Sequence, residues 1–248
     1  MNLLIVNYHY VRDKKSGRGI YPITPSELSA QIDFLSKKYQ FISQGDLKSF
    51  TEGNDYPDSD LCLLTFDDGL KEQLKGFDIL KRRQIPAIFF VSTMPIRDRK
   101  VCLVHKFHYV MEQMNHRELR NYLFQTFPFA ADRWKDPKFI QAATSKYIFD
   151  DPNQALVKFH VNYVLNISEK KLFIDELFAF LVLHEEHFLE KLYMSDSEIK
   201  NIADAGMLGS HSHSHEPLGV LKELAIDLEL KESKLILEQL SGNPIYSV

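Results

Sequence analysis

Two groups of residues that commonly bind metals stand far apart in the sequence. They are the acidic pair Asp67 and Asp68, and the alternating histidines His211, His213 and His215. One carboxylate with two imidazoles is a common ligand set for a divalent metal, most often zinc. Three protein ligands leave a position for water, and zinc can lower the pKa of that water from about 15.7 to about 7. If the two groups meet in the fold, the protein can activate water for hydrolysis.

Each group also has an ordinary explanation. Asp67-Asp68-Gly69 is a common turn sequence, and a histidine-rich tract can be a solvated loop with only adventitious metal affinity. The segment His184-Glu185-Glu186-His187 has some similarity to a metalloprotease helix. Its histidines, however, are three residues apart rather than four, which indicates a solvated helix face. On the residues alone, these alternatives stay open.

The predicted secondary structure would bring the two groups to one edge of a sheet. The apolar run 61–66 has the length of a strand buried on both faces, and it ends at the acidic pair. Further strands are expected at 3–7, as the first buried strand, and at 85–91 and 207–210. Helical spacing between strands, as in 24–35, predicts parallel α/β architecture. Because parallel strands point their carboxyl ends the same way, the two groups should converge.

The strand pattern stops between about residues 105 and 193, where aromatic-rich helical spacing predicts a helical insertion. The α/β pattern resumes at Ser195, which begins a capping-box sequence. A last helix is expected to end at Gly242, and residues 244–248 begin as another strand would. The chain is therefore predicted to be an α/β protein with one large helical interruption.

The composition limits the partners and the compartment. With 34 acidic and 30 basic residues the formal net charge is −4, and no basic cluster calls for nucleic acid. Two cysteines supply no disulfide framework, and a reducing compartment is expected. The apolar stretch at the amino terminus is too short for a signal peptide or a membrane span. We therefore expect a cytoplasmic protein without a transmembrane segment, and its oligomeric state stays open.

Two separated motifs resemble those of the polysaccharide deacetylases, carbohydrate esterase family four. Thr65-Phe66-Asp67-Asp68-Gly69 resembles the TFDDG motif of that family, and the segment His211–His215 resembles its HxxxH motif. The motifs occur in the family's order, and the similarity covers about 1–104 and 195–248. The resemblance implies a partial or deformed (β/α) barrel with the helical insertion, in a single deacetylase-like catalytic domain spanning 1–248.

The resemblance also implies roles for individual residues. Asp67 would be the catalytic base that takes a proton from water. The metal ligands would be Asp68, His211 and His215. His9, at the end of the first strand, and His213 are candidates for contact with the substrate or the ligands. The implied reaction removes the acetyl group from an N-acetylated sugar in a glycan or glycan precursor, with zinc as the expected cofactor.

The family pattern continues with motifs that this sequence does not reach. They contain an Arg-Pro segment, an aspartate that orients the base, and a histidine that protonates the leaving amine. The sequence ends at Val248 before any of them, so the C-terminal part of the barrel is expected to be missing. Two alternative functions therefore stay open: an amidohydrolase acting on a small non-sugar amide or imide, and a catalytically incomplete domain that binds a metal or a partner.

Overall fold

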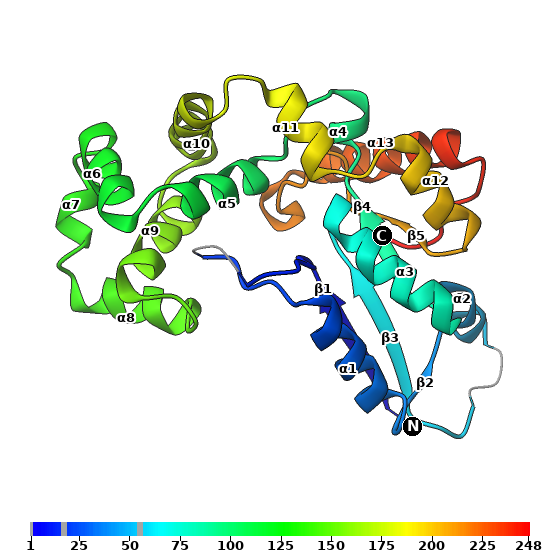
Figure 1. Cartoon of the computed structure of the whole chain (residues 1–248). Coiled ribbons are helices and arrows are strands. Elements are labelled where there is room, and N and C mark those ends of the chain that lie inside the picture. The colour runs from blue at the N-terminus through cyan, green and yellow to red at the C-terminus, as the bar shows by residue number, and fades with distance from the viewer. Residues whose placement is uncertain (1, 16–18, 54–56) are drawn as a thin grey trace. The chain divides into compact units, whose positions relative to one another are not determined.

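The computed structural model describes residues 2–15, 19–53 and 57–248, and Figure 1 shows the chain coloured by residue number. The chain forms two compact units. The first consists of Met1–Lys15, Pro22–Cys102 and Glu185–Val248, and the second consists of Ser16–Tyr21 and Leu103–His184. Two separate stretches of the second unit therefore interrupt the sequence of the first.

A parallel sheet forms the centre of the first unit (Figure 1). Its strands are β1 (Leu3–Tyr8), β2 (Gln40–Phe41), β3 (Leu61–Phe66), β4 (Ile88–Val91) and β5 (Leu208–Ser210). The order is β1-β3-β4-β5, β2 pairs with the first residues of β3, and all of these pairs are parallel. The residues that follow β3 and β5 therefore leave the sheet at the same edge. This confirms the predicted α/β class with a parallel sheet.

Burial on both faces explains why residues 61–66 form the central strand. All six side chains of β3 are buried, and Phe66 stacks on Phe89 of β4 with ring centroids 4.5 Å apart. The helices of this unit are α1 (Pro25–Leu35), α2 (Gln44–Thr51), α3 (Leu74–Arg83), α4 (Met94–Arg97), α11 (Glu185–Leu192), α12 (Asp196–Asp204) and α13 (Glu223–Ser241), with 3-10 helices η1 (Lys71–Gln73) and η2 (Leu218–Val220). Side chains from α1, α3, α12 and α13 share one apolar core with β3.

Local signals in the sequence fix where several of these helices begin and end. Thr24 caps α1 in a capping box with Glu27, and Ser195 caps α12 in the same way with Glu198. α13 ends at Gly242, whose φ of 72° is the left-handed conformation that glycine adopts most easily. The helix boundaries predicted at these positions are confirmed.

Two strand predictions need correction. The first strand is not buried on both faces, because Leu3 and Ile5 are 42% and 57% exposed. Successive strand residues point to opposite faces, and only the face that carries Leu4 and Val6 packs against the core. In the described part of the chain no strand forms at 244–248, although the Ser210 N–H donates to the Ser247 carbonyl at 2.9 Å.

The second unit is helical. Its helices are α5 (Leu103–Gln113), α6 (His116–Thr126), α7 (Ala130–Arg133), α8 (Pro137–Lys146), α9 (Pro152–Tyr163) and α10 (Ile167–Leu181). Lys158 of α9 forms a buried ion pair with Asp150 at 2.6 Å and donates to the Gly19 carbonyl at 2.8 Å. The Tyr21 hydroxyl also donates to Asp150, at 2.7 Å. These contacts attach the short stretch 19–21 to the helices.

None of the helices in the described part of the chain combines the length and the apolar character needed to cross a bilayer.

Candidate metal centre

Strand β3 brings the two aspartates to the carboxyl edge of the sheet. The Asp67 N–H donates to the Tyr8 carbonyl at 3.0 Å, and the chain then turns, with φ values of 85° at Asp68 and 67° at Gly69. A Cβ atom on residue 69 would lie 3.0 Å from the Val91 side chain. Glycine is therefore favoured at residue 69, both for its backbone conformation and for the close approach of the Val91 side chain of β4.

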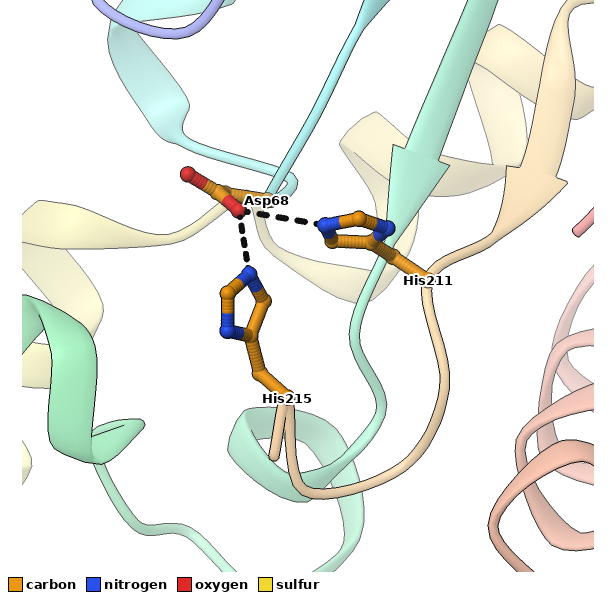
Figure 2. A group of neighbouring side chains, drawn as sticks. All are labelled: Asp68, His211 and His215. Carbon is orange, nitrogen blue, oxygen red and sulfur yellow. Dashed lines mark hydrogen bonds and ion pairs between the residues drawn. The ribbon is translucent and has the colours of Figure 1, made fainter. Parts of the chain in front are cut away.

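Strand β5 brings the histidines to the same edge. The His211 N–H donates to the Val91 carbonyl at 3.0 Å, so the pairing with β4 continues into the first histidine. Two left-handed residues follow, Ser212 with a φ of 59° and His215 with a φ of 62°. Figure 2 shows the result: the chain curves between His211 and His215, and both imidazoles point toward Asp68.

Asp68, His211 and His215 form a compact group of candidate metal ligands (Figure 2). Asp68 is only 3% exposed. Its Oδ1 atom lies 2.8 Å from Nε2 of His215 and 3.5 Å from Nε2 of His211. One donor atom from each of the three residues lies within 4.8 Å of the others. The structure thus brings together the three residues that the sequence analysis proposed as ligands.

The donor set fits a divalent metal. Zinc binds imidazole nitrogen and carboxylate oxygen at about 2.0–2.2 Å, which places neighbouring ligand atoms roughly 3–4 Å apart. The separations of 2.8 and 3.5 Å from the Asp68 oxygen need only small side-chain movements to reach that geometry. A nearly buried carboxylate is also costly without a compensating positive charge, and a cation between these three side chains would supply it.

His215 already has a charge-compensated environment. Burial lowers the pKa of His215, but the hydrogen bond from its imidazole to Asp68 and the negative charges of Asp68 and Asp67 together raise the pKa above its ordinary value of 6.5. A proton on His215 therefore partly replaces the positive charge that a metal would bring. A metal and this proton would compete for the same nitrogen.

Asp67 has different neighbours from Asp68. Its Oδ2 atom accepts a hydrogen bond from Nδ2 of Asn7 at 2.7 Å and lies 3.6 Å from Nε2 of His9. The Oδ1 atom of Asn7 in turn accepts a hydrogen bond from the Thr65 hydroxyl at 2.9 Å. Because the side-chain oxygen of Asn7 accepts from Thr65, the side-chain nitrogen of Asn7 faces Asp67. One carboxylate of the acidic pair therefore joins the histidines, and the other is held beside β1.

The two remaining histidines of the sequence prediction lie in different places. His9 is beside Asp67, with a side chain that is 47% exposed. His213 is turned away from the candidate ligands and is buried: its Nδ1 atom lies 2.9 Å from the Thr93 hydroxyl, and its Nε2 atom lies 3.2 Å from Oδ2 of Asp98. Of these two, only His9 is placed next to one of the acidic residues at the centre.

Three residues that support the centre were missed in the sequence analysis. Asn7 contacts Asp67, as described above. Gln73, which is fully buried, donates from its side-chain amide to the carbonyls of His9 and Asp67. Glu229 accepts hydrogen bonds from the backbone of the histidine loop. Of the three, Asn7 alone had a signal, since it lies at the end of a predicted strand, two residues before His9.

Comparison with known proteins relates this architecture to solved structures. No protein-family model and no curated protein match the sequence. IcaB from Ammonifex degensii matches with a TM-score of 0.54 and 17% identity, over 98% of this chain and 71% of that one. The Streptococcus pyogenes deacetylase PplD, solved in complex with acetate, matches with a TM-score of 0.50 and 12% identity, over 99% of this chain and 70% of that one. The chain has a polysaccharide deacetylase-like fold.

The polysaccharide deacetylase-like fold here is shorter than some of the structures it matches. BC0361, a polysaccharide deacetylase from Bacillus cereus, matches at 16% identity with a TM-score of 0.49, over 99% of this chain. This chain spans about half, 49%, of the length of that structure. At such identities the likeness concerns the fold, and the roles of residues have to be argued from the site itself.

Proposed function

We propose that this protein is a metal-dependent hydrolase that removes the acetyl group from an N-acetylated sugar of a glycan or glycan precursor. The observation that carries the proposal is the group formed by Asp68, His211 and His215 at the carboxyl edge of the sheet. The separate placement of Asp67 beside this group supports it, because the chemistry needs a carboxylate that is free of the metal. The fold of the deacetylase structures agrees with this reaction class.

Each residue has a distinct part in the proposed reaction. Asp68, His211 and His215 would hold the cation, most suitably zinc, which when bound polarises an oxygen and makes water more acidic. A water oxygen attacks the amide carbonyl carbon, and Asp67 accepts the proton that this water loses. The carbon–nitrogen bond then breaks, the nitrogen takes up a proton, and acetate leaves together with a free amino sugar.

In this proposal the half-exposed His9 would touch the substrate, because its imidazole borders Asp67 and remains open to solvent. His213 has no such role in the proposal, since its ring is buried against Thr93 and Asp98. A glycan intermediate inside the cell, such as a lipid-linked or nucleotide-linked sugar, is the proposed substrate source, in line with the cytoplasmic location predicted from the sequence.

Substitution of the proposed base gives the first test. Asp67→Asn keeps the size of the side chain but removes proton acceptance, so acetate release from N-acetylglucosamine oligomers should fall by about 10²–10⁴-fold. Zinc content should stay near that of the wild type, because Asp67 is not among the proposed ligands. Asp68→Asn is the matched comparison, and it should lose zinc as well as activity.

The same measurements discriminate the other functions. Turnover of small amides or cyclic imides by a protein that releases no acetate from sugars would favour an amidohydrolase. Tight zinc binding with no hydrolysis of either substrate class, and no effect of Asp67→Asn, would identify a metal-binding or partner-binding domain. A wild-type protein that binds no divalent metal would remove the basis of the proposal.

A further inference from the structure

The loop that carries the candidate histidine ligands has a strained backbone. Ser212 and His215 both have positive φ values, 59° and 62°, a conformation that residues with a Cβ atom seldom adopt. Such conformations persist where surrounding contacts over-determine them. One strained residue, Ser212, lies between the two proposed histidine ligands, and the other is the ligand His215 itself. The loop has this conformation because it must turn both imidazoles toward the same point (Figure 2). The contacts that hold this loop therefore bear directly on the ligand geometry.

Glu229 of α13 is the acidic contact on one side of the loop. Its Oε2 atom accepts hydrogen bonds from the N–H groups of His213 and Ser214, at 2.9 and 2.7 Å. These are consecutive backbone donors at the centre of the turn, and a carboxylate acceptor makes such bonds stronger than a neutral acceptor does. The two bonds join the loop to α13 across 16 and 15 residues of sequence. A helix outside the ligand group thereby fixes the middle of the loop.

The other side of the loop is held by the β4–α4 segment. The Met94 N–H donates to the His213 carbonyl at 2.9 Å, and the Ser92 hydroxyl donates to the His211 carbonyl at 2.9 Å. The buried His213 ring also meets the Thr93 hydroxyl, at 2.9 Å. The loop is therefore held between two elements, the β4–α4 segment on one side and Glu229 of α13 on the other.

We infer that Glu229 is a positioning residue for the metal centre: by holding the His213 and Ser214 amides it keeps His211 and His215 in one ligand geometry. This inference rests on the proposed metal site, and it goes beyond it by assigning a role to a residue on α13. Glu229 is not in the group of candidate ligands, so its effect on a bound metal acts through the loop. Loss of such supporting contacts commonly weakens metal affinity by about 10–100-fold.

The test compares Glu229→Gln and Glu229→Ala with Asp227→Asn. Asp227 lies on the same helix and pairs with the exposed Lys231, so Asp227→Asn removes one negative charge from α13 without touching the loop. Zinc dissociation constants come from competition with a chromophoric chelator. We expect Glu229→Ala to weaken zinc binding by about 10–100-fold and Glu229→Gln by a smaller factor, with Asp227→Asn within about twofold of wild type.

Two readouts distinguish positioning from general stability. The visible absorption of bound Co²⁺ should change in the Glu229 variants, because ligand geometry sets its intensity, and should be unchanged in Asp227→Asn. In the metal-free protein, the amides of His213 and Ser214 should exchange with solvent faster in Glu229→Gln, while the melting temperature stays close to wild type. The exchange measurement keeps the inference testable if Glu229→Ala fails to fold.

The outcomes separate this inference from the proposed function. Wild-type zinc affinity together with unchanged amide exchange in Glu229→Gln would overturn the role of Glu229 and leave the proposed deacetylase intact. An equal loss of affinity in Asp227→Asn and Glu229→Gln would also overturn it, since charge alone would then be the cause. Weakened zinc binding in the Glu229 variants, in a protein that releases no acetate, would support the inference and reject the deacetylase. A wild type that binds no zinc would reject both.

Discussion

The side chain of Asn7 makes two hydrogen bonds of opposite sense. It accepts from the Thr65 hydroxyl and donates to Asp67, and both partners are available because Asn7 and Thr65 are paired in the parallel register of β1 and β3. The bond to Asp67 limits the rotation of the carboxylate and leaves its other oxygen for a proton. Asn7 therefore orients the proposed base without being a candidate ligand.

Substitution of Asn7 should affect turnover and leave the metal in place. A hydrogen bond to a charged group contributes about 1.5–3 kcal/mol when shielded, and less at an exposed position such as this one. We expect Asn7→Ala to lower kcat for acetate release by about 10-fold, with zinc affinity within about twofold of wild type. Steady-state kinetics and zinc titration check this.

The control for Asn7→Ala is Asn2→Ala, which removes the same side chain next to the other end of β1, where it contacts Asp60. It should leave kcat unchanged. If Asn7→Ala reduced zinc binding and kcat in parallel, the proposed separation between the base and the ligands would be wrong.

At the scale of the elements, the site depends on how closely β4 and β5 approach each other. Gly209 is the central residue of β5, and a Cβ atom there would lie 2.6 Å from the Phe90 ring and 2.8 Å from the Ile88 side chain. Real Cβ atoms do not tolerate such contacts, so a larger residue must push the two strands or their side chains apart. Because His211 follows β5 directly, its position depends on this packing.

Gly209→Ala should therefore destabilise the protein, by about 1–3 kcal/mol in the free energy of unfolding, as overpacked sites commonly do. Urea denaturation followed by circular dichroism measures the change. Gly219→Ala is the matched control, because nothing lies within 4 Å of a Cβ atom at that position, and it should change the free energy by less than about 0.5 kcal/mol. Equal stabilities of the two variants would show that the strands adapt to a methyl group here.

The sequence predicted those elements that have a strong local signal. The apolar run 61–66, the capping boxes at Thr24 and Ser195, and the polar residues at the ends of two strands were all visible without coordinates. Strand β2 has only two residues and so shows no periodicity. The exposed face of β1 could not be predicted, because a run of apolar residues does not reveal which neighbours cover it.

Contacts that depend on tertiary packing were also outside the reach of the sequence. The pairing of Asn7 with Thr65 requires the register of two strands that are 58 residues apart, and no local pattern sets a parallel register. The contact of Glu229 with the histidine loop depends on the rotation of α13 about its axis, and the sequence gives only its amphipathic spacing. The candidate ligands and the proposed base lie in the two sequence motifs and were therefore predictable. The residues that support them, Asn7 and Glu229, lie outside the motifs and were not.

At the scale of the whole molecule, the second unit contains a histidine in an unfavourable environment. His160 of α9 is fully buried, and neither ring nitrogen has a hydrogen-bond partner among the described residues. Its ring lies against Trp134 and Phe139, with centroids 6.3 and 5.2 Å away. Burial, with a smaller effect from the charge of Arg133, lowers the pKa of His160 from 6.5 to about 4.

This environment predicts acid sensitivity with a defined sign. Between pH 6.5 and about 4 the unfolded chain binds a proton at residue 160 and the folded chain does not, so stability falls as the pH decreases through this window. His160→Phe removes both the proton site and the unsatisfied nitrogens. It should raise the free energy of unfolding by about 1–2 kcal/mol at pH 7 and reduce the loss of stability on acidification.

Thermal unfolding of wild type and His160→Phe at pH 7 and pH 5 would measure both effects. The gain in stability should be larger at pH 5. A variant less stable than wild type at both values would mean that the phenyl ring does not fit, and His160→Leu would then separate fit from protonation. The same pH dependence in wild type and both variants would show that His160 does not cause the acid sensitivity.

The attachment of Tyr21 to the second unit has a consequence for engineering. The hydroxyl of Tyr21 and the side chain of Lys158 both contact the buried Asp150 carboxylate. Tyr21 and Asp150 belong to the same unit, but they come from the two separate stretches of sequence that form it. Excising 103–184 on its own would strip Asp150 and Lys158 away from the loop that follows β1. A chimera that exchanges this module between related proteins must therefore carry both stretches as a matched set.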